Sequence, residues 1–269
     1  MLRAIWNSIF VNTYYELERQ KSTSNTFDKK TFAILSTVII CLVFIEYFGN
    51  FQFLISTLKN LELRELSASI AALQGYFPNA RLFQLSYWVA VLVTFYFIVP
   101  LAIIKLFFKD KLNDYGLSPK EFFANYKIYV AFFLFMVPLI LFVSTTESFQ
   151  HKYPFYKPNG ESLWPNFMIW QCLYIAQFFA LEFFFRGFML HGIKNKFGFY
   201  AIFVMMIPYV MIHFQKPMPE TLGAIFAGII LGALSLKSRS IWLGVAIHYS
   251  VAITMDLAAL WQKGYFQGI

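Results

Sequence analysis

The sequence has few charged residues for its length. Only 13% of its 269 residues are charged, whereas 59% are hydrophobic and the mean hydropathy is +0.57. A soluble domain carries about 25% charged residues, so this chain could not cover its surface in water. The composition excludes an ordinary soluble enzyme and predicts an all-α, polytopic transmembrane helix bundle.

Cysteine and several common motifs are also scarce. The two cysteines, Cys41 and Cys172, lie in apolar runs and have no CxxC partner, which argues against a disulfide framework or a thiolate metal site. We expect both to be small buried hydrophobic side chains. No HExxH motif, internal repeat or low-complexity tract is present, so a metal site would depend on residues that are distant in sequence.

The chain does contain apolar runs of membrane-spanning length, which is about 20 helical residues. We predict about seven spans, with an eighth crossing at 62–80 as the alternative to an interfacial or re-entrant helix there. In the sixth span, Gly228 and Gly232 form a GxxxG pattern that predicts close packing against a neighbouring span. The seven predicted spans are 31–51, 83–107, 128–146, 165–190, 197–214, 221–236 and 240–260.

Residues 1–30 precede the first long apolar run and do not have the pattern of a signal peptide. Apolar residues recur at helical spacing from Ile5 to Leu17, which predicts an amphipathic helix in the membrane interface. We therefore divide the chain into an interfacial segment at 1–30, N-terminal transmembrane helices at 31–163, and core helices at 164–269.

Basic residues indicate the orientation of the spans. With seven spans, 14 Lys and Arg fall on the side of the N-terminus and 7 on the other side, while Arg186 lies within a span. The positive-inside rule then places the N-terminus in the cytoplasm. We expect a multi-pass protein of the inner (plasma) membrane whose net charge of +8 faces lipid headgroups, not nucleic acid.

Four ionisable side chains lie in the apolar C-terminal runs, where such groups usually mark function. They are Glu182, Arg186, His213 and His248. A carboxylate and two imidazoles from three helices could activate a water molecule and stabilise an oxyanion, or form a His₂Glu metal site. A structural alternative is that Glu182 and Arg186, at i and i+4, only neutralise each other inside the bundle.

The order of these residues resembles a known family. "LEFFFRG", "YVMIH" and "RSIWLGVAIH", within Trp164 to Leu260, resemble the motifs of the CAAX-protease and bacteriocin-processing (CPBP, or Abi) intramembrane proteases. The resemblance implies an intramembrane endopeptidase, glutamic or metal-dependent, that hydrolyses a membrane-proximal peptide bond. It leaves open whether a divalent metal such as zinc is used, bound by Glu182, His213 and His248, or no cofactor at all.

Carried over by position, the resemblance places the water-activating Glu of the family at Leu181, so Glu182, the carboxylate that remains, is the candidate base, with Arg186 as its ion-pair partner. It assigns His213 and His248 as ligands of the water or the oxyanion, with Tyr209 as the aromatic residue four positions before His213. Two positions, Leu181 and Ala252, depart from the family pattern.

The first motif of the family has a Glu where this chain has Leu181, and the third has an Asn where this chain has Ala252. Asp256 is two helical turns past His248 and is a poor substitute for that Asn. These departures make a degenerate, non-catalytic member that binds a membrane peptide or partner the alternative function. Straight spans also place His213 roughly 15 Å from Glu182 along the bundle axis, so a shared site requires tilted or broken helices.

Overall fold

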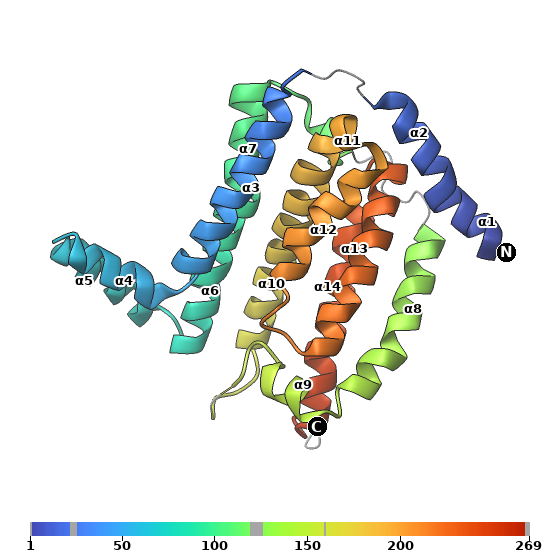
Figure 1. Cartoon of the computed structure of the whole chain (residues 1–269). Helices are drawn as coiled ribbons and strands as arrows, with labels where there is room; N and C mark the ends of the chain where they lie inside the picture. The colour runs from blue at the N-terminus through green and yellow to red at the C-terminus, as the bar shows by residue number, and fades with distance from the viewer. Residues whose placement is uncertain (1, 22–25, 119–125, 159, 267–269) are drawn as a thin grey trace.

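The computed structural model describes residues 2–21, 26–118, 126–158 and 160–266. Within these ranges the chain is helical with one isolated β-bridge, and six helices are long and apolar enough to cross a membrane. The predicted all-α polytopic bundle is therefore confirmed (Figure 1). The six helices are α3 (Lys29–Phe48), the run Ala80–Phe108 that begins with α6 (Ala80–Val93) and includes α7 (Val99–Ala102), α8 (Tyr126–Val143), the run Asn166–Met211, α13 (Met218–Ser238) and α14 (Trp242–Gln262).

The run Asn166–Met211 is 46 residues long and doubles back on itself. It consists of α10 (Asn166–Glu182), a π-helical continuation (Phe183–His191), α11 (Gly192–Phe197) and α12 (Ala201–Met211). Gly198 separates α11 from α12 with φ +57°, which glycine adopts without strain. Figure 1 shows α11 at one end of the bundle, with α10 and α12 both running back from it toward the opposite end. This run thus turns back at Gly198, as the predicted spans 165–190 and 197–214 require, but α12 has only 11 residues and is shorter than the second predicted span.

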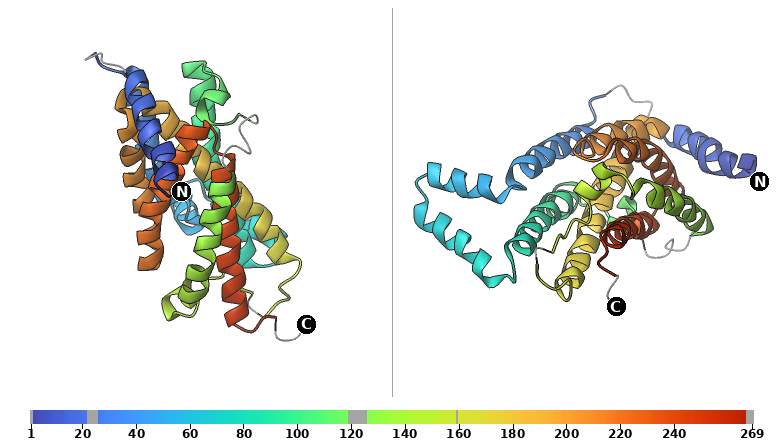
Figure 2. Two further views of the ribbon diagram at one scale, coloured as in Figure 1. Left: turned by 90° about the vertical axis from the view of Figure 1, so that its right-hand side faces the viewer. Right: turned by 90° about the horizontal axis from the view of Figure 1, so that it is seen from below.

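The shorter helices lie outside the bundle core. The N-terminal segment forms α1 (Leu2–Trp6) and α2 (Asn12–Gln20), joined by a π-helical turn, and buries Ile9 and Leu17 on its inner face. The weak segment predicted near 62–80 contains α5 (Arg64–Ala72), which forms a hairpin with the unpredicted α4 (Phe51–Asn60). The hairpin projects sideways from the bundle, as seen from below in Figure 2. α9 (Glu147–Lys152) lies near the C-terminus.

The centre of the bundle is formed by the run that contains α10. Of its most apolar 18-residue window, 61% is buried, against 28% for α3 and 11% for α8. The aromatic residues of "EFFFRGF" are wholly buried there because other helices surround them: Phe183, Phe184, Phe185 and Phe188. The C-terminal helices therefore form the core, and the N-terminal helices α3 and α8 expose most of their surface to lipid.

Two small residues let α13 approach α12 closely. A Cβ atom at Gly228 would lie 3.2 Å from Met206 Cγ, and one at Gly232 would lie 3.2 Å from Ile202 Cγ2. The close packing predicted from the GxxxG pattern is confirmed, and α12 is the neighbour.

The expectation that both cysteines are buried is half right, because Cys41 is buried whereas Cys172 is exposed on α10.

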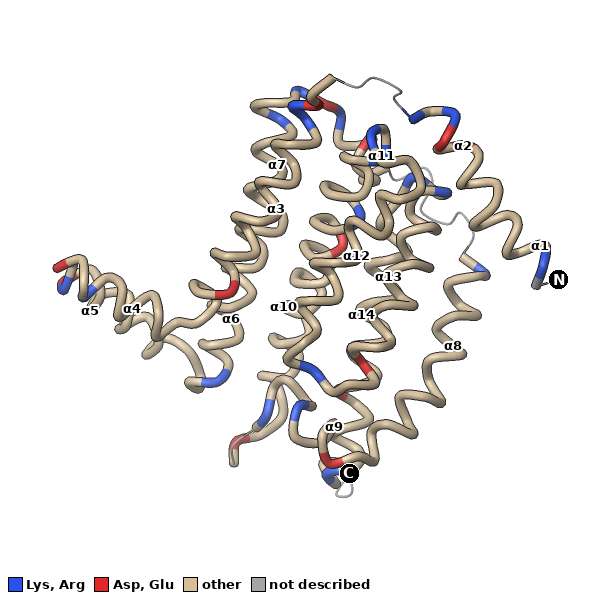
Figure 3. Tube along the Cα trace, viewed as in Figure 1, with Lys and Arg blue, Asp and Glu red and all other residues tan. Residues whose placement is uncertain are grey.

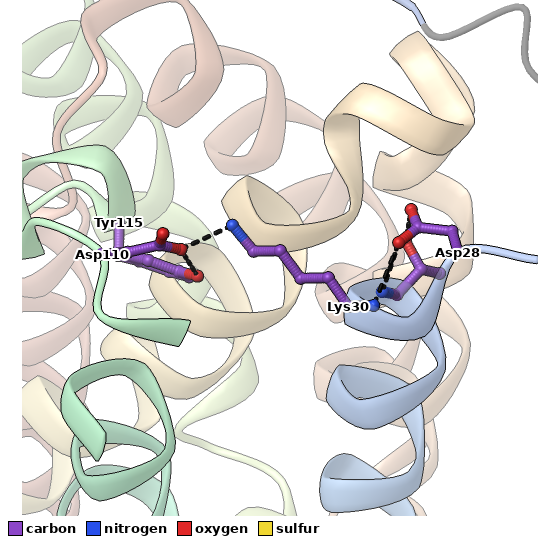
Figure 4. Close-up of polar contacts among 5 residues, drawn as sticks. Asp28, Lys30, Asp110 and Tyr115 are labelled. Atoms are coloured by element: carbon purple, nitrogen blue, oxygen red, sulfur yellow. Dashed lines mark hydrogen bonds and ion pairs between the residues drawn. The ribbon is translucent and has the colours of Figure 1, made fainter. Parts of the chain in front are cut away.

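A polar cluster holds α3 at the end of the bundle near α11. Asp28 caps α3 by accepting hydrogen bonds from the backbone N–H groups of Lys30 and Thr31, at 3.0 and 3.2 Å. The Lys30 ammonium group reaches Asp110 Oδ2 at 2.6 Å, and the Tyr115 hydroxyl donates to the same oxygen at 2.7 Å (Figure 4). The cluster ties the start of α3 to the loop that follows Phe108.

Candidate functional site

The opposite charges of Glu182 and Arg186 meet in the centre of the bundle. Arg186 Nη1 lies 3.0 Å from Glu182 Oε1, and both side chains are almost wholly buried. The guanidinium Cζ also lies 4.0 Å from the centre of the Tyr209 ring, a cation–π contact. The chain can keep this charge pair in an apolar core because the two opposite charges lie next to each other, and the Tyr209 ring adds a further contact to the guanidinium.

His248 contacts the same carboxylate oxygen. Its Nδ1 lies 2.9 Å from Glu182 Oε1, which brings α14 and α10 together at their motifs. Gly244 makes room for this contact, because a Cβ atom there would lie 2.8 Å from Glu182 Oε2. Since a carboxylate beside a guanidinium accepts hydrogen bonds, we assign the Nδ1 proton to His248, which leaves its Nε2 lone pair free.

His213 is held in a similar way, although it lies two residues beyond the end of α12. Its Nδ1 lies 2.8 Å from the backbone oxygen of Tyr209, and a carbonyl oxygen can only accept. The Nδ1 proton therefore lies on this bond, and Nε2 is again free. His213 is buried, not a helix-end imidazole among the headgroups.

Two cavities meet at the two histidines. An apolar cavity of about 340 Å³ lies between α8, α13 and α14, and a polar cavity of about 840 Å³ lies between α10, the α3–α4 junction, α6 and the loop after α12. The residues that line both cavities, called the shared wall below, are Tyr174, Phe178, His213, Lys216 and His248. Both imidazoles are thus accessible from two chemically different spaces.

The predicted site residues therefore come closer together than straight spans would allow. The Tyr209 ring lies 4.9 Å from the His213 ring and 6.4 Å from the His248 ring, centre to centre. α12 is short, and Figure 2 shows α10 inclined to α14. These two features bring together groups that a bundle of straight spans would separate by about 15 Å along its axis.

Glu182 differs from the two histidines in its access. It is 1% exposed and lines neither cavity. The carboxylate lies behind His248, so it can reach a substrate or water only through the imidazole. This position does not match a carboxylate that takes a proton from water directly.

The side chains do not fit the three-ligand metal site considered from sequence. Within the described ranges, no group of three or more His, Cys, Asp and Glu side chains could hold a metal ion together. The Glu182 oxygen nearest to His248 contacts Nδ1, the nitrogen that carries the proton. The chemistry below is therefore derived from the protein side chains alone.

The two positions at which the sequence predicts a departure from the family motifs both face a cavity. Leu181 lines the polar cavity, and Ala252 lines the apolar cavity one helical turn past His248. Asp256 does not replace the missing Asn, because its carboxylate accepts hydrogen bonds from Trp170 Nε1 and the Phe155 backbone N–H, both at 3.0 Å. It holds the loop before α10 against α14.

Sequence reasoning missed several residues near the site. Lys216 and Tyr174 complete the shared wall, and neither has a distinctive sequence signal. His191 is also buried, with its Nε2 3.1 Å from Ser235 Oγ, but it lines neither cavity. Gln177 could have been found from sequence, because it is a polar residue four positions before Leu181. On a helix this spacing places the two residues on the same face.

Comparison with known proteins supports the resemblance seen in the motifs. Residues 163–254 match the family described as Type II CAAX prenyl endopeptidase Rce1-like. No curated protein and no solved structure matches the chain. The matched segment contains α10, α12, α13 and most of α14, and so includes Glu182, Arg186, His213 and His248. The segment that carries the four candidate residues is thus similar to the CPBP family, in its Rce1-like group.

Proposed function

We propose that this protein is an intramembrane endopeptidase of CAAX type that hydrolyses a peptide bond close to the membrane. The observation that carries the proposal is the contact between Glu182 and His248 at the wall shared by the two cavities, within the segment that matches the family. A buried carboxylate that orients an imidazole is an arrangement used for general-base catalysis.

In the proposed mechanism, His248 is the base. Its Nε2 takes a proton from a water molecule as the water oxygen bonds to the peptide carbonyl carbon, and the carbonyl π electrons move to oxygen. Glu182 holds the Nδ1 proton and stabilises the imidazolium that forms. The tetrahedral intermediate then collapses, the C–N bond breaks, and the leaving amine takes the proton from His248.

Two further residues have supporting roles in this proposal. The free Nε2 of His213 accepts a hydrogen bond from the same water molecule and so orients it toward the carbonyl. Arg186 balances the charge of Glu182, so that the carboxylate stays ionised in the core. Glu182 thus acts through His248 and is a positioning residue, which modifies the role that the family resemblance implies.

The test uses the purified full-length chain in lipid nanodiscs with a library of quenched-fluorescence peptides. We expect cleavage by the wild type and a loss of about 10²–10⁴-fold in rate for His248→Gln, the size of a general-base contribution. His151→Gln is the matched control, because His151 is exposed on α9 and lines neither cavity. Equal rates for wild type and His248→Gln would refute the role of His248.

The two departed positions test whether the site is complete. If this chain has a weakened site, Leu181→Glu with Ala252→Asn would raise cleavage above that of the wild type, because an oxyanion donor is typically worth about 10²–10³ in rate. Both positions face cavities, so the new side chains would reach the site. Rapid wild-type cleavage that these changes do not raise would instead show that the His248–Glu182 pair is sufficient.

A further inference from the structure

The polar cavity contains one buried polar side chain that the proposed mechanism does not use. Gln177 lies on α10, lines this cavity and is 5% exposed. Its Oε1 atom is buried and accepts no hydrogen bond from any residue that the structure describes. Buried amide groups in proteins are nearly always paired, so this one requires an explanation.

A second glutamine on the same helix shows the usual arrangement. Gln171 is also 5% exposed, but both ends of its amide have partners. Its nitrogen donates to Asp256 Oδ2 at 3.4 Å, and its oxygen accepts from the Tyr249 hydroxyl at 3.3 Å. The fold therefore satisfies Gln171 internally and leaves Gln177 unpaired at the edge of a cavity, where a bound ligand can supply the partner.

The position of Gln177 relates it to the candidate site. Gln177 and Leu181 are four residues apart on α10, so they lie one above the other on the same face, and both line the polar cavity. Phe178, next to Gln177, belongs to the shared wall, and its ring centre lies 4.6 Å from that of His248. The Gln177 amide thus lies in the cavity that His248 and His213 also line, about one helical turn along α10 from Leu181.

A primary amide is suited to bind a peptide backbone. Its oxygen accepts from a backbone N–H, and its NH₂ group donates to a backbone carbonyl, whatever the side chains of the peptide are. We propose that Gln177 binds the backbone of the substrate in the polar cavity, beside the candidate site.

This inference rests on the proposed function, and its first test compares two substitutions of the same size. Gln177→Met should lower kcat/KM about tenfold, the effect of losing one hydrogen bond, and should leave Tm unchanged or raise it. Gln171→Met should lower Tm, because it removes the hydrogen bonds that Gln171 makes to Asp256 and Tyr249. Cleavage by Gln177→Met at the wild-type rate would overturn the inference.

A second test identifies the partner of the amide. In the peptide that the wild type cleaves best, each backbone N–H near the cleaved bond is replaced in turn by an ester oxygen. We expect one position at which the ester slows the wild type about tenfold but does not slow Gln177→Met further. Esters that affect both proteins equally at every position would exclude a bond between Gln177 and the backbone.

A binding measurement separates failure of the inference from failure of the proposed function. If the wild type cleaves no peptide in the library, the proposed function fails, and the same peptides with a fluorescent label are titrated into wild type and Gln177→Met. Binding that is weaker for Gln177→Met would uphold the backbone contact without catalysis. Equal binding, or none to either protein, would overturn it.

Discussion

One oxygen atom of Glu182 serves two partners at the centre of the bundle. Arg186 Nη1 and His248 Nδ1 both lie within 3.0 Å of Oε1, so the carboxylate links the charge balance of the core to the orientation of the imidazole. The same contacts would exist in a purely structural ion pair. What favours a catalytic role is the position of His248 between two cavities, with its second nitrogen free.

Loss of the guanidinium should destabilise the fold strongly. Arg186→Ala leaves a buried carboxylate without its cation, and removing one partner of a buried pair costs about 3–5 kcal/mol. We expect a low yield and a large fall in the thermal unfolding temperature in detergent, with much of the loss recovered by Glu182→Gln combined with Arg186→Met. Arg64→Ala is the control, since the Arg64–Glu62 pair is largely exposed and should contribute little. Wild-type yield and unfolding temperature for Arg186→Ala would disprove the buried pair.

The space at Gly244 should matter for activity more than for stability. A Cβ atom in Gly244→Ala would meet Glu182 Oε2 at 2.8 Å, and the end of that flexible side chain would have to move. Since loss of the carboxylate that orients a catalytic histidine costs about 10⁴ in kcat, a displaced carboxylate should cost at least about tenfold. Peptide cleavage is compared with that of Gly75→Ala, whose Cβ would meet nothing within 4 Å. Equal activity in the two variants would argue against a positioning role for Glu182.

At the scale of whole elements, the apolar runs predict the spans well because lipid requires long helices. The π-helical continuation Phe183–His191 and the short α12 could not be predicted, since they depend on how buried aromatic residues pack. α4 was missed because its ten residues follow α3 with only two residues between them. The ordered motifs predicted which residues cluster, but not that Glu182 lies behind His248, because rotamers are set by packing.

The polar cluster at the start of α3 should make stability depend on pH. Burial alone raises the pKa of Asp110, but the hydrogen bonds from Lys30 and Tyr115 outweigh it and lower the pKa below its ordinary value of 3.8. A lowered pKa in the folded state gives stability that is present above the ordinary value and is lost as pH falls through the folded value.

Asp110→Asn should therefore lower Tm by roughly 1–3 °C at pH 7, as expected for a partly exposed pair worth up to about 1 kcal/mol. The difference from wild type should shrink as the pH falls below about 4. Thermal unfolding in detergent over this pH range checks it, with the exposed Asp114→Asn as the control. A difference that is constant with pH would mean that the ion pair contributes nothing.

At the scale of the whole molecule, the two ends of the bundle differ in charge. Lys and Arg gather at the end that carries α11 and the start of α3, and fewer lie at the end near α9 (Figure 3). We propose that the α11 end faces the cytoplasm. A reporter fused after Asp110 should then be cytoplasmic, and one fused after Tyr156 should be external. Fusions that report the same side would contradict the arrangement of spans.

The apolar cavity has a consequence for how rates should be measured. It includes side chains of α8 and α13 that are exposed to the lipid side, such as Phe135 and Phe226, at 63% and 65% exposure. A substrate that enters there reaches the enzyme by lateral diffusion in the bilayer. Its effective concentration is therefore its mole fraction in the bilayer. Added lipid, at fixed amounts of enzyme and substrate, would slow cleavage of a membrane-anchored peptide by dilution within the surface, whereas a water-soluble peptide that enters through the polar cavity would be cleaved at an unchanged rate.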